Sequence, residues 1–339
     1  MEKIRMCLVG VGSIGRRHLR LLNERDDVTL SVVEPYEASW ERVTKEIGTF
    51  RRFTSLDEAL ASGEIDAVVI ATPHGMHAKM AIQALEAGVH VFCEKPMSDS
   101  LEECVAMVKA AKNTDKVFSC GFMFHFDPHI QKMKEILDSG RLGKLLHFTN
   151  RFGSYNILLC SITKHQAHTP YSVIMDCIHD TDLLYYFTGR IPDHVYMNGF
   201  QAGDMELSSP QNVVDAIYRY DSGDLGANCH FNYIQHPQVH TLELVCEKGY
   251  MRYDLMEPSI TVGTIDKKVE KITIELKPDD VYRAEWEGFL SAVRGERKPE
   301  NDADSAIVPT LLMAAQRESA ETGKEVSIRE LAERCGYTY

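Results

Sequence analysis

The sequence predicts an α/β fold, with an N-terminal doubly wound parallel sheet and a C-terminal α+β domain that has a large, mostly antiparallel open sheet. In residues 1–122, short apolar runs alternate with helical segments, which is typical of βαβ units with right-handed crossovers. From about residue 194, apolar runs follow one another with turns but no helices between them, which favours antiparallel pairing. The 339 residues suit two domains. We therefore expect domains over 1–122 and 123–339.

The first 34 residues carry the most specific pattern. The run Ile4–Val9 predicts a strand, the turn Gly10-Val11-Gly12-Ser13-Ile14-Gly15 follows at once, and residues 16–22 predict a helix. A second strand over residues 28–33 ends on Glu34. Strand, glycine turn, helix, strand and acid form the context in which such a turn indicates a dinucleotide-binding Rossmann domain.

Each glycine of this turn has its own physical role. Gly10 allows the tight turn, Gly12 lets a pyrophosphate approach the backbone, and Gly15 lets the helix pack closely on the strand. The N-terminus of the helix adds free N–H groups and the positive end of its dipole. The alternative is a glycine-rich βα turn that binds nothing, which this context disfavours.

Glu34 indicates which cofactor to expect. Its carboxylate can accept hydrogen bonds from the adenosine ribose and would repel a 2′-phosphate, so NAD is favoured over NADP. Arg16 and Arg17 leave NADP open, because a nearby arginine can accommodate that phosphate.

Further strands and helices complete the first domain. We expect strands at 53, 67–71, 89–93 and 117–121, and helices over 39–46, 56–61, 76–87 and 100–112. Ligands of such sheets lie outside the carboxyl ends of the strands. The strand ends at which we expect a site are Gly10, Glu34, Thr72, Glu94 and Gly121.

The second domain mixes helices with a run of strands. We expect helices over 128–139, 173–188, 281–294 and 303–321, a loop over 157–171, and strands at 145–153, 194–200, 213–220, 225–234, 240–246, 249–253, 259–264 and 270–275. We also expect an apolar, uncovered sheet face, which suggests a subunit interface, at Tyr218, Phe231, Tyr233, Leu242 and Leu244.

Two places could carry acid–base chemistry. Lys95 directly follows a strand, at the edge where a ligand is expected, and Pro96 biases it to an extended conformation. On a continuous helix Asp176 would share a face with His179 and with Asp180, and a histidine oriented by a carboxylate is a suitable general base. Alternatively, Lys95 is a surface lysine and Asp176 only stabilises the helix dipole.

Composition limits the class of protein and its partners. The formal net charge of −13 argues against nucleic acid or an anionic membrane as partner. No apolar run reaches the length of a membrane helix. Because a strand is predicted from Ile4 on, we expect no signal peptide. Nine cysteines without C-x-x-C pairs favour reduced thiols in the cytoplasm. Because histidines and cysteines near 160–179 lack zinc spacing, we expect no metal.

Several segments together resemble the glucose–fructose oxidoreductase / inositol dehydrogenase (Gfo/Idh/MocA) family. They run almost from end to end and are the glycine turn, Thr72-Pro73-His74-Gly75-Met76-His77, Glu94-Lys95-Pro96, Gly121-Phe122-Met123, residues 176–182, Glu287-Gly288-Phe289 and residues 319–326. The tripeptide Glu94-Lys95-Pro96 is the most specific of them.

The resemblance implies an NAD(P)-dependent dehydrogenase that acts on a secondary hydroxyl of a sugar, sugar derivative or inositol. It also implies oligomerisation, as a homodimer or homotetramer, through the C-terminal sheet. It implies catalysis by Lys95, Asp176 and His179, and substrate binding by these three residues and His125. We expect the cofactor to contact Gly10, Gly12, Ser13, Ile14, Gly15, Glu34, Thr72, Pro73, His77, Glu94 and Lys95.

Other interpretations stay open at this stage. The spacing from Asp176 to His179 is shorter than in many relatives, and His125 stands where relatives often carry Arg or Asn, so the substrate is undetermined. Either Lys95 or His179 could exchange the proton. One alternative function is an NAD-retaining enzyme that cleaves glycosides by transient oxidation. The other is a non-catalytic sugar or dinucleotide sensor.

Overall fold

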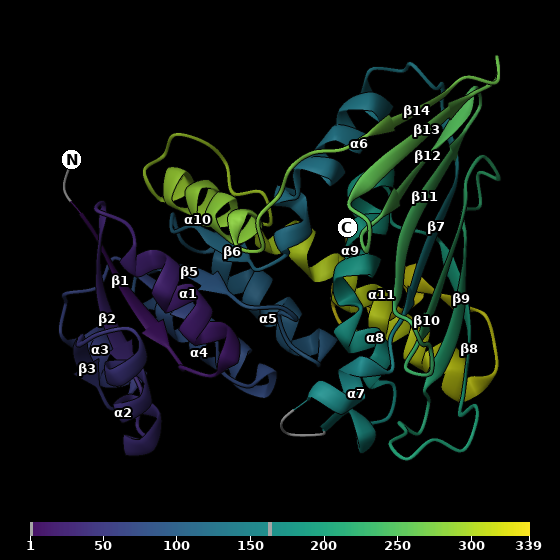
Figure 1. The fold of residues 1–339 in the computed structure, drawn as a ribbon. Helices are drawn as coiled ribbons and strands as arrows, with labels where there is room; N and C mark the ends of the chain where they lie inside the picture. Colours follow the sequence, from purple (N-terminus) through teal and green to yellow (C-terminus); the bar gives the residue numbers. More distant parts are fainter. Residues whose placement is uncertain (1–2, 162–164) are drawn as a thin grey trace. The chain divides into compact units, whose positions relative to one another are not determined.

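The computed structural model describes residues 3–161 and 165–339, which form two compact units. The first unit comprises residues 1–123 and 278–310, and the second comprises residues 124–277 and 311–339. Figure 1 shows the elements of both units along the chain. None of the helices within the described ranges is both long and apolar enough to cross a membrane.

The first unit is built on a six-stranded parallel sheet in the order β3-β2-β1-β4-β5-β6. Its strands are β1 (Ile4–Val9), β2 (Val28–Val33), β3 (Arg51–Phe53), β4 (Ala67–Ile70), β5 (His90–Cys93) and β6 (Phe118–Cys120). Its helices are α1 (Ser13–Asn23), α2 (Glu37–Glu46), α3 (Leu56–Ala61), α4 (His77–Glu86), α5 (Leu101–Lys112) and α10 (Asp280–Val293). The predicted doubly wound sheet is confirmed.

Apolar strand residues and helix faces explain why this unit folds as it does. Every residue of β4 is buried, as expected for a central parallel strand covered on both faces. Helix α1 buries Leu19 and Leu22 in the core around this sheet. Helix α5 begins where Ser100 accepts a hydrogen bond from the backbone N–H of Glu103, which caps the N-terminus of the helix.

Residues 278–310 pack with the first unit, although we predicted a continuous second domain over 123–339. The reason is hydrophobic: Trp286, Phe289 and Leu290 of α10 belong to the core cluster that contains Leu8 and Phe92. Sequence periodicity identifies the apolar face of α10 but not the sheet that buries it. The division of function at residue 122 remains a prediction.

The second unit is built on a nine-stranded sheet in the order β14-β13-β12-β11-β7-β10-β9-β8-β15. All neighbours are antiparallel except β7 and β10. The strands are β7 (Leu145–Gly153), β8 (His194–Phe200), β9 (Val213–Arg219), β10 (Gly226–Asn232), β11 (Val239–Cys246), β12 (Gly249–Asp254), β13 (Ser259–Thr264), β14 (Val269–Ile272) and β15 (Val326–Ser327). The predicted large, mostly antiparallel open sheet is confirmed.

The helices of this unit differ from the prediction in two places. They are α6 (Pro128–Asp138), α7 (Asn156–Cys160), α8 (Ser172–Asp176), α9 (Ile178–Thr188) and α12 (Ile328–Arg334), and α11 (Ala303–Thr322) runs from the first unit into the second. The predicted single helix over 173–188 is wrong, because the backbone leaves helical geometry at Cys177. The predicted loop over 157–171 contains α7 and a 3₁₀ helix over His165–Ala167, while residues 162–164 lie outside the described residues.

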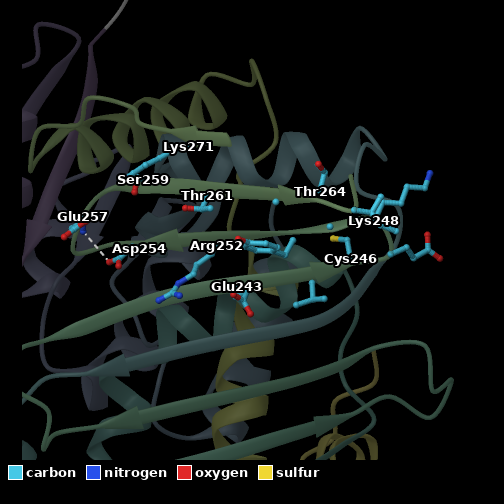
Figure 2. A pocket seen from close by; sticks show the side chains of 16 residues that line it. Glu243, Cys246, Lys248, Arg252, Asp254, Glu257, Ser259, Thr261, Thr264 and Lys271 are labelled. Atoms are coloured by element: carbon cyan, nitrogen blue, oxygen red, sulfur yellow. Dashed lines mark hydrogen bonds between the residues drawn. The ribbon is translucent and has the colours of Figure 1, made fainter. Parts of the chain in front are cut away.

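The prediction of an apolar uncovered face is also wrong. The five residues that we assigned to it are at most 2% exposed and lie on the face covered by α6, α8 and α9, namely Tyr218, Phe231, Tyr233, Leu242 and Leu244. The opposite face is largely polar. A hollow of about 670 Å³ lies on it. Figure 2 shows Glu243, Arg252 and Thr261, which line this hollow from β11, β12 and β13. The strands at which these residues lie, β9, β10 and β11, alternate between buried and more exposed side chains, and our prediction placed the buried side in solvent.

Candidate active site

A cavity of about 1110 Å³ lies at the carboxyl ends of β1, β2 and β4 in the first unit. Ligands of parallel sheets bind at this edge. Seven predicted cofactor residues line the cavity: Gly10, Gly12, Ser13, Ile14, Glu34, Thr72 and Pro73. The remaining four, Gly15, His77, Glu94 and Lys95, lie outside its wall. Tyr36 and Met80 also line the cavity, and neither was predicted, because neither belongs to a motif.

The glycine turn has the geometry that a dinucleotide requires. Gly10 has a φ of +89°, and a Cβ added to Gly15 would lie 2.1 Å from the carbonyl oxygen of Gly10. A Cβ added to Gly12 would meet no atom within 4 Å, so this position opens toward the cavity. No side chain of the described residues caps the N-terminus of α1, which leaves its first N–H groups to a ligand. These residues fit a pyrophosphate.

Glu34 places a buried carboxylate at the end of β2. It is 5% exposed, and its Oε1 accepts a hydrogen bond from the backbone N–H of Tyr36 at 2.9 Å. Its Oε2 accepts a longer bond, at 3.4 Å, from the N–H of Val11 in the glycine turn. Of the two arginines that left NADP open, Arg16 pairs with Glu46, whereas Arg17 lines the cavity.

The tripeptide Glu94-Lys95-Pro96 follows β5. Glu94 is 7% exposed; its Oε1 lies 2.6 Å from Nε2 of His18, and its Oε2 accepts the backbone N–H of Lys95 at 3.1 Å. Burial acts to raise the pKa of Glu94, but the hydrogen bond and charge of His18, with the charge of Lys95, lower it overall. Glu94 is therefore a carboxylate that supports the backbone of Lys95, and the Lys95 side chain is half-buried.

In the second unit, Asp176 and His179 lie on either side of the break between α8 and α9. Oδ2 of Asp176 accepts hydrogen bonds from the hydroxyl of Tyr233 at 2.5 Å and from Nε2 of Gln166 at 3.3 Å. Burial, followed by the charge of Asp176, raises the pKa of Tyr233 well above its usual range, so this phenol stays a donor. The ring of His179 lies 5.2 Å from that of Phe124.

Two acids of α9, Asp180 and Asp182, each contact a histidine. Oδ1 of Asp180 lies 2.5 Å from Nε2 of His240 and accepts Nδ2 of Asn150 at 2.9 Å. Oδ2 of Asp182 lies 2.6 Å from Nε2 of His125. We predicted that Asp180 would share a face with Asp176, but the break at Cys177 gives the two acids different partners.

Some of these partners escaped the sequence reasoning. They are Gln166, Tyr233, Asn150 and His240, and three of them come from the sheet or its loops. Only the alternation of apolar residues along the strands could have indicated which side chains face the helices. Lys95 belongs to the first unit, and Asp176, His179 and His125 belong to the second. Their joint action remains a prediction.

Comparisons with known proteins give one consistent result. Residues 4–122 match a family model described as "Oxidoreductase family, NAD-binding Rossmann fold", and residues 130–252 match the GFO/IDH/MocA C-terminal domain. The chain is 25% identical over 339 residues to a myo-inositol 2-dehydrogenase of Thermotoga maritima, covering 97% of this chain and 99% of that protein. It is 32% identical over 230 residues to a scyllo-inositol 2-dehydrogenase (NAD(+)) of Bacillus subtilis, covering 66% of each.

A solved structure supports the fold. The crystal structure of scyllo-inositol dehydrogenase from Lactobacillus casei, with bound NAD(H) and scyllo-inositol, superposes with a TM-score of 0.81. It covers 96% of this chain and 99% of that chain at 22% sequence identity.

Proposed function

Because the chain belongs to the Gfo/Idh/MocA family of oxidoreductases, with its NAD-binding Rossmann fold in residues 4–122, we propose that it oxidises a secondary hydroxyl of a sugar, sugar derivative or inositol with NAD. The observation that carries this proposal is the cavity at the ends of β1, β2 and β4, in the unit that also presents Lys95 after β5. The inositol dehydrogenases among the relatives support the substrate class.

Bound NAD supplies the hydride acceptor. In this proposal, the Lys95 ammonium donates a hydrogen bond to the reacting oxygen and stabilises the negative charge that develops on it. His179 takes the hydroxyl proton as general base. Asp176, which is held by Tyr233 and Gln166, accepts a hydrogen bond from a second substrate hydroxyl. His125, whose Nε2 is held by Asp182, also contacts the substrate.

The two domains divide the work. Residues 1–122 bind the cofactor, and residues 123–339 bind the substrate and mediate assembly. Glu34 makes NAD the preferred cofactor, because its carboxylate is already held at the cavity wall, where a 2′-phosphate would be repelled. All nine cysteines lie in the described part of the chain and are free thiols, which supports a cytoplasmic protein.

We further propose a homodimer or homotetramer formed through the uncovered face of the nine-stranded sheet. This face is mostly polar, with Ile217 60% exposed and Tyr196 43% exposed on neighbouring strands. The interface would therefore combine a few apolar contacts with charge complementarity around residues such as Arg252 and Glu243. Light scattering at micromolar concentration tests this, and a single monomeric mass would exclude it.

The test of the proposed function is a screen of sugars, inositols and nucleotide sugars for NADH formation. We expect net NADH with at least one member of these classes. Glycoside cleavage without net NADH would favour the NAD-retaining alternative instead. Binding of NAD without turnover of any compound would favour a sensor.

A further inference from the structure

Two buried histidines contact the tripeptide Glu94-Lys95-Pro96 from opposite ends of its sequence. His18 of α1 is fully buried, and its Nε2 lies 2.6 Å from Oε1 of Glu94. His77, the first residue of α4, is 1% exposed, and its Nδ1 lies 2.8 Å from the carbonyl oxygen of Pro96. Lys95 stands between the two contacted residues, so its backbone is held on both sides.

The second ring nitrogen of His77 fixes the chemical form of this contact. Nε2 of His77 lies 2.8 Å from the carbonyl oxygen of Thr72. A carbonyl oxygen only accepts hydrogen bonds, and neutral imidazole carries one N–H. In the neutral form, one nitrogen would therefore turn its lone pair toward a carbonyl lone pair. Only the imidazolium donates from both nitrogens.

His77 also connects two parts of the site. Thr72 lines the cofactor cavity, whereas Pro96 directly follows Lys95. His77 itself is absent from the cavity wall. His77 therefore connects the cavity wall, through Thr72, to the backbone next to Lys95, through Pro96, and is not itself part of the wall.

On the N-terminal side of Lys95, Glu94 is also contacted at two polar atoms. The Glu94 carboxylate receives His18 on one oxygen and the N–H of Lys95 on the other. The ring of His18 is packed edge-on against those of Phe92, Tyr282 and Trp286, with centroids 5.1 to 5.8 Å away. This packing restricts the ring of His18, and the contact with His18 in turn restricts the carboxylate of Glu94.

We propose that His18 and His77 are positioning residues that bracket Lys95, and that His77 acts as an imidazolium that donates to the carbonyls of Thr72 and Pro96. The proposal rests on the function proposed above for Lys95. A displacement of about 1 Å at a reacting group can cost roughly 100-fold in rate, so support of this kind bears directly on turnover.

The protonation of His77 can be measured without substrate. In ¹⁵N-labelled full-length protein at neutral pH, both ring nitrogens of His77 should give the signals of protonated nitrogens, assigned by their loss in His77→Gln. A signal from a non-protonated ring nitrogen would overturn the imidazolium assignment.

Two variants of His77 separate positioning from simple packing. The amide nitrogen of Asn reaches about as far as Nδ1 of His, toward Pro96, and that of Gln reaches about as far as Nε2, toward Thr72. We expect kcat of His77→Gln to be lower than that of His77→Asn by roughly 10-fold or more. NAD affinity should agree within about 3-fold between the two variants, because position 77 is not part of the cavity wall.

His18 offers the matching pair, because its contact with Glu94 uses Nε2. There His18→Gln should retain more turnover than His18→Asn, which is the reverse of the order expected at His77. Equal kcat within each pair would overturn the proposal. So would parallel losses of kcat, NAD affinity and thermal stability in both members of a pair, which would indicate packing alone.

Lys95→Ala distinguishes this proposal from the proposed function. Wild-type turnover in Lys95→Ala would refute the function, and the nitrogen signals would still decide the state of His77. Low turnover in Lys95→Ala with wild-type turnover in every histidine variant would overturn the positioning role alone.

Discussion

In the first unit, Glu34 and His77 form hydrogen bonds with main-chain groups near strand ends. In the second unit, Asp176 and Asp180 form hydrogen bonds with side chains that are distant in sequence. Tyr233 is 57 positions from Asp176, and His240 is 60 positions from Asp180. Main-chain partners come with the strand–turn–helix pattern itself, so a short motif is enough to place them. Side-chain partners depend on the register of distant strands. The proposed cofactor site is thus local in sequence, whereas the proposed substrate site is not.

The largest effects should arise at the reacting group proposed for each unit, Lys95 in the first and His179 in the second. Lys95→Ala and His179→Ala should each lower kcat by roughly 100-fold or more, the usual contribution of general acid–base catalysis. NAD affinity should change little, because the glycine turn and Glu34 line the cavity, whereas Lys95 and His179 lie outside its wall. Steady-state kinetics beside a fluorescence titration of NAD checks both. Normal turnover in His179→Ala alone would leave Lys95 as the proton partner.

The distant contacts of the second unit can be tested at Tyr233. Tyr233→Phe removes the hydroxyl that donates to Asp176 at 2.5 Å, so kcat/KM should fall by about 10-fold or more, or about 1.4 kcal/mol. Tyr253→Phe is the matched control, because it removes a similar bond from a buried tyrosine to Asp127. We expect the control to lose stability but not activity. Equal kinetics in the two variants would show that Tyr233 only packs.

These contacts show how far the sequence could predict the molecule. The glycine turn and Glu34 were predicted in place, because their geometry follows from the strand ends that carry them. The partners of Asp176 were missed, because Tyr233 was assigned to the wrong face of its strand and the break at Cys177 has no glycine or proline to mark it. The placement of α10 depended on tertiary packing of Trp286, which periodicity does not specify.

Cofactor preference tests the local site of the first unit. NAD should bind about 10-fold more tightly than NADP, a difference of about 1.4 kcal/mol, and Glu34→Gln should narrow this ratio. Glu37→Gln is the control, since it removes the same charge three positions later from a residue outside the cavity wall. Titration of both cofactors decides it. Tighter binding of NADP to the wild type would point to Arg17 instead.

The smallest effect concerns Glu285 of α10, which lies in the first unit but outside the cofactor cavity. Burial, with the charge of Glu94 adding to it, raises the pKa of Glu285 well above its usual range. The folded state therefore binds more protons than the unfolded state as pH rises above the ordinary carboxyl pKa. The contribution of Glu285 to the free energy of unfolding is therefore fully present below the ordinary carboxyl pKa. It is lost as the pH rises from there through the raised pKa of the folded state.

Glu285→Gln should remove this dependence and raise the free energy of unfolding by about 1 kcal/mol at neutral pH, with a gain that grows from acid toward neutral. Denaturant unfolding at several pH values measures it. Glu296→Gln, at an exposed position after the same helix, should show no such trend. A pH-independent difference between Glu285→Gln and the wild type would contradict the raised pKa.

In the proposed reaction, this chain transfers a hydride from a carbon bearing a hydroxyl to NAD. The most direct test uses a substrate identified by the screen, deuterated at the carbon that is oxidised, with mass spectrometry of the nicotinamide product. We predict one deuterium in the reduced cofactor for each substrate molecule consumed. Consumption of the substrate with no deuterium left in the cofactor would contradict net dehydrogenation.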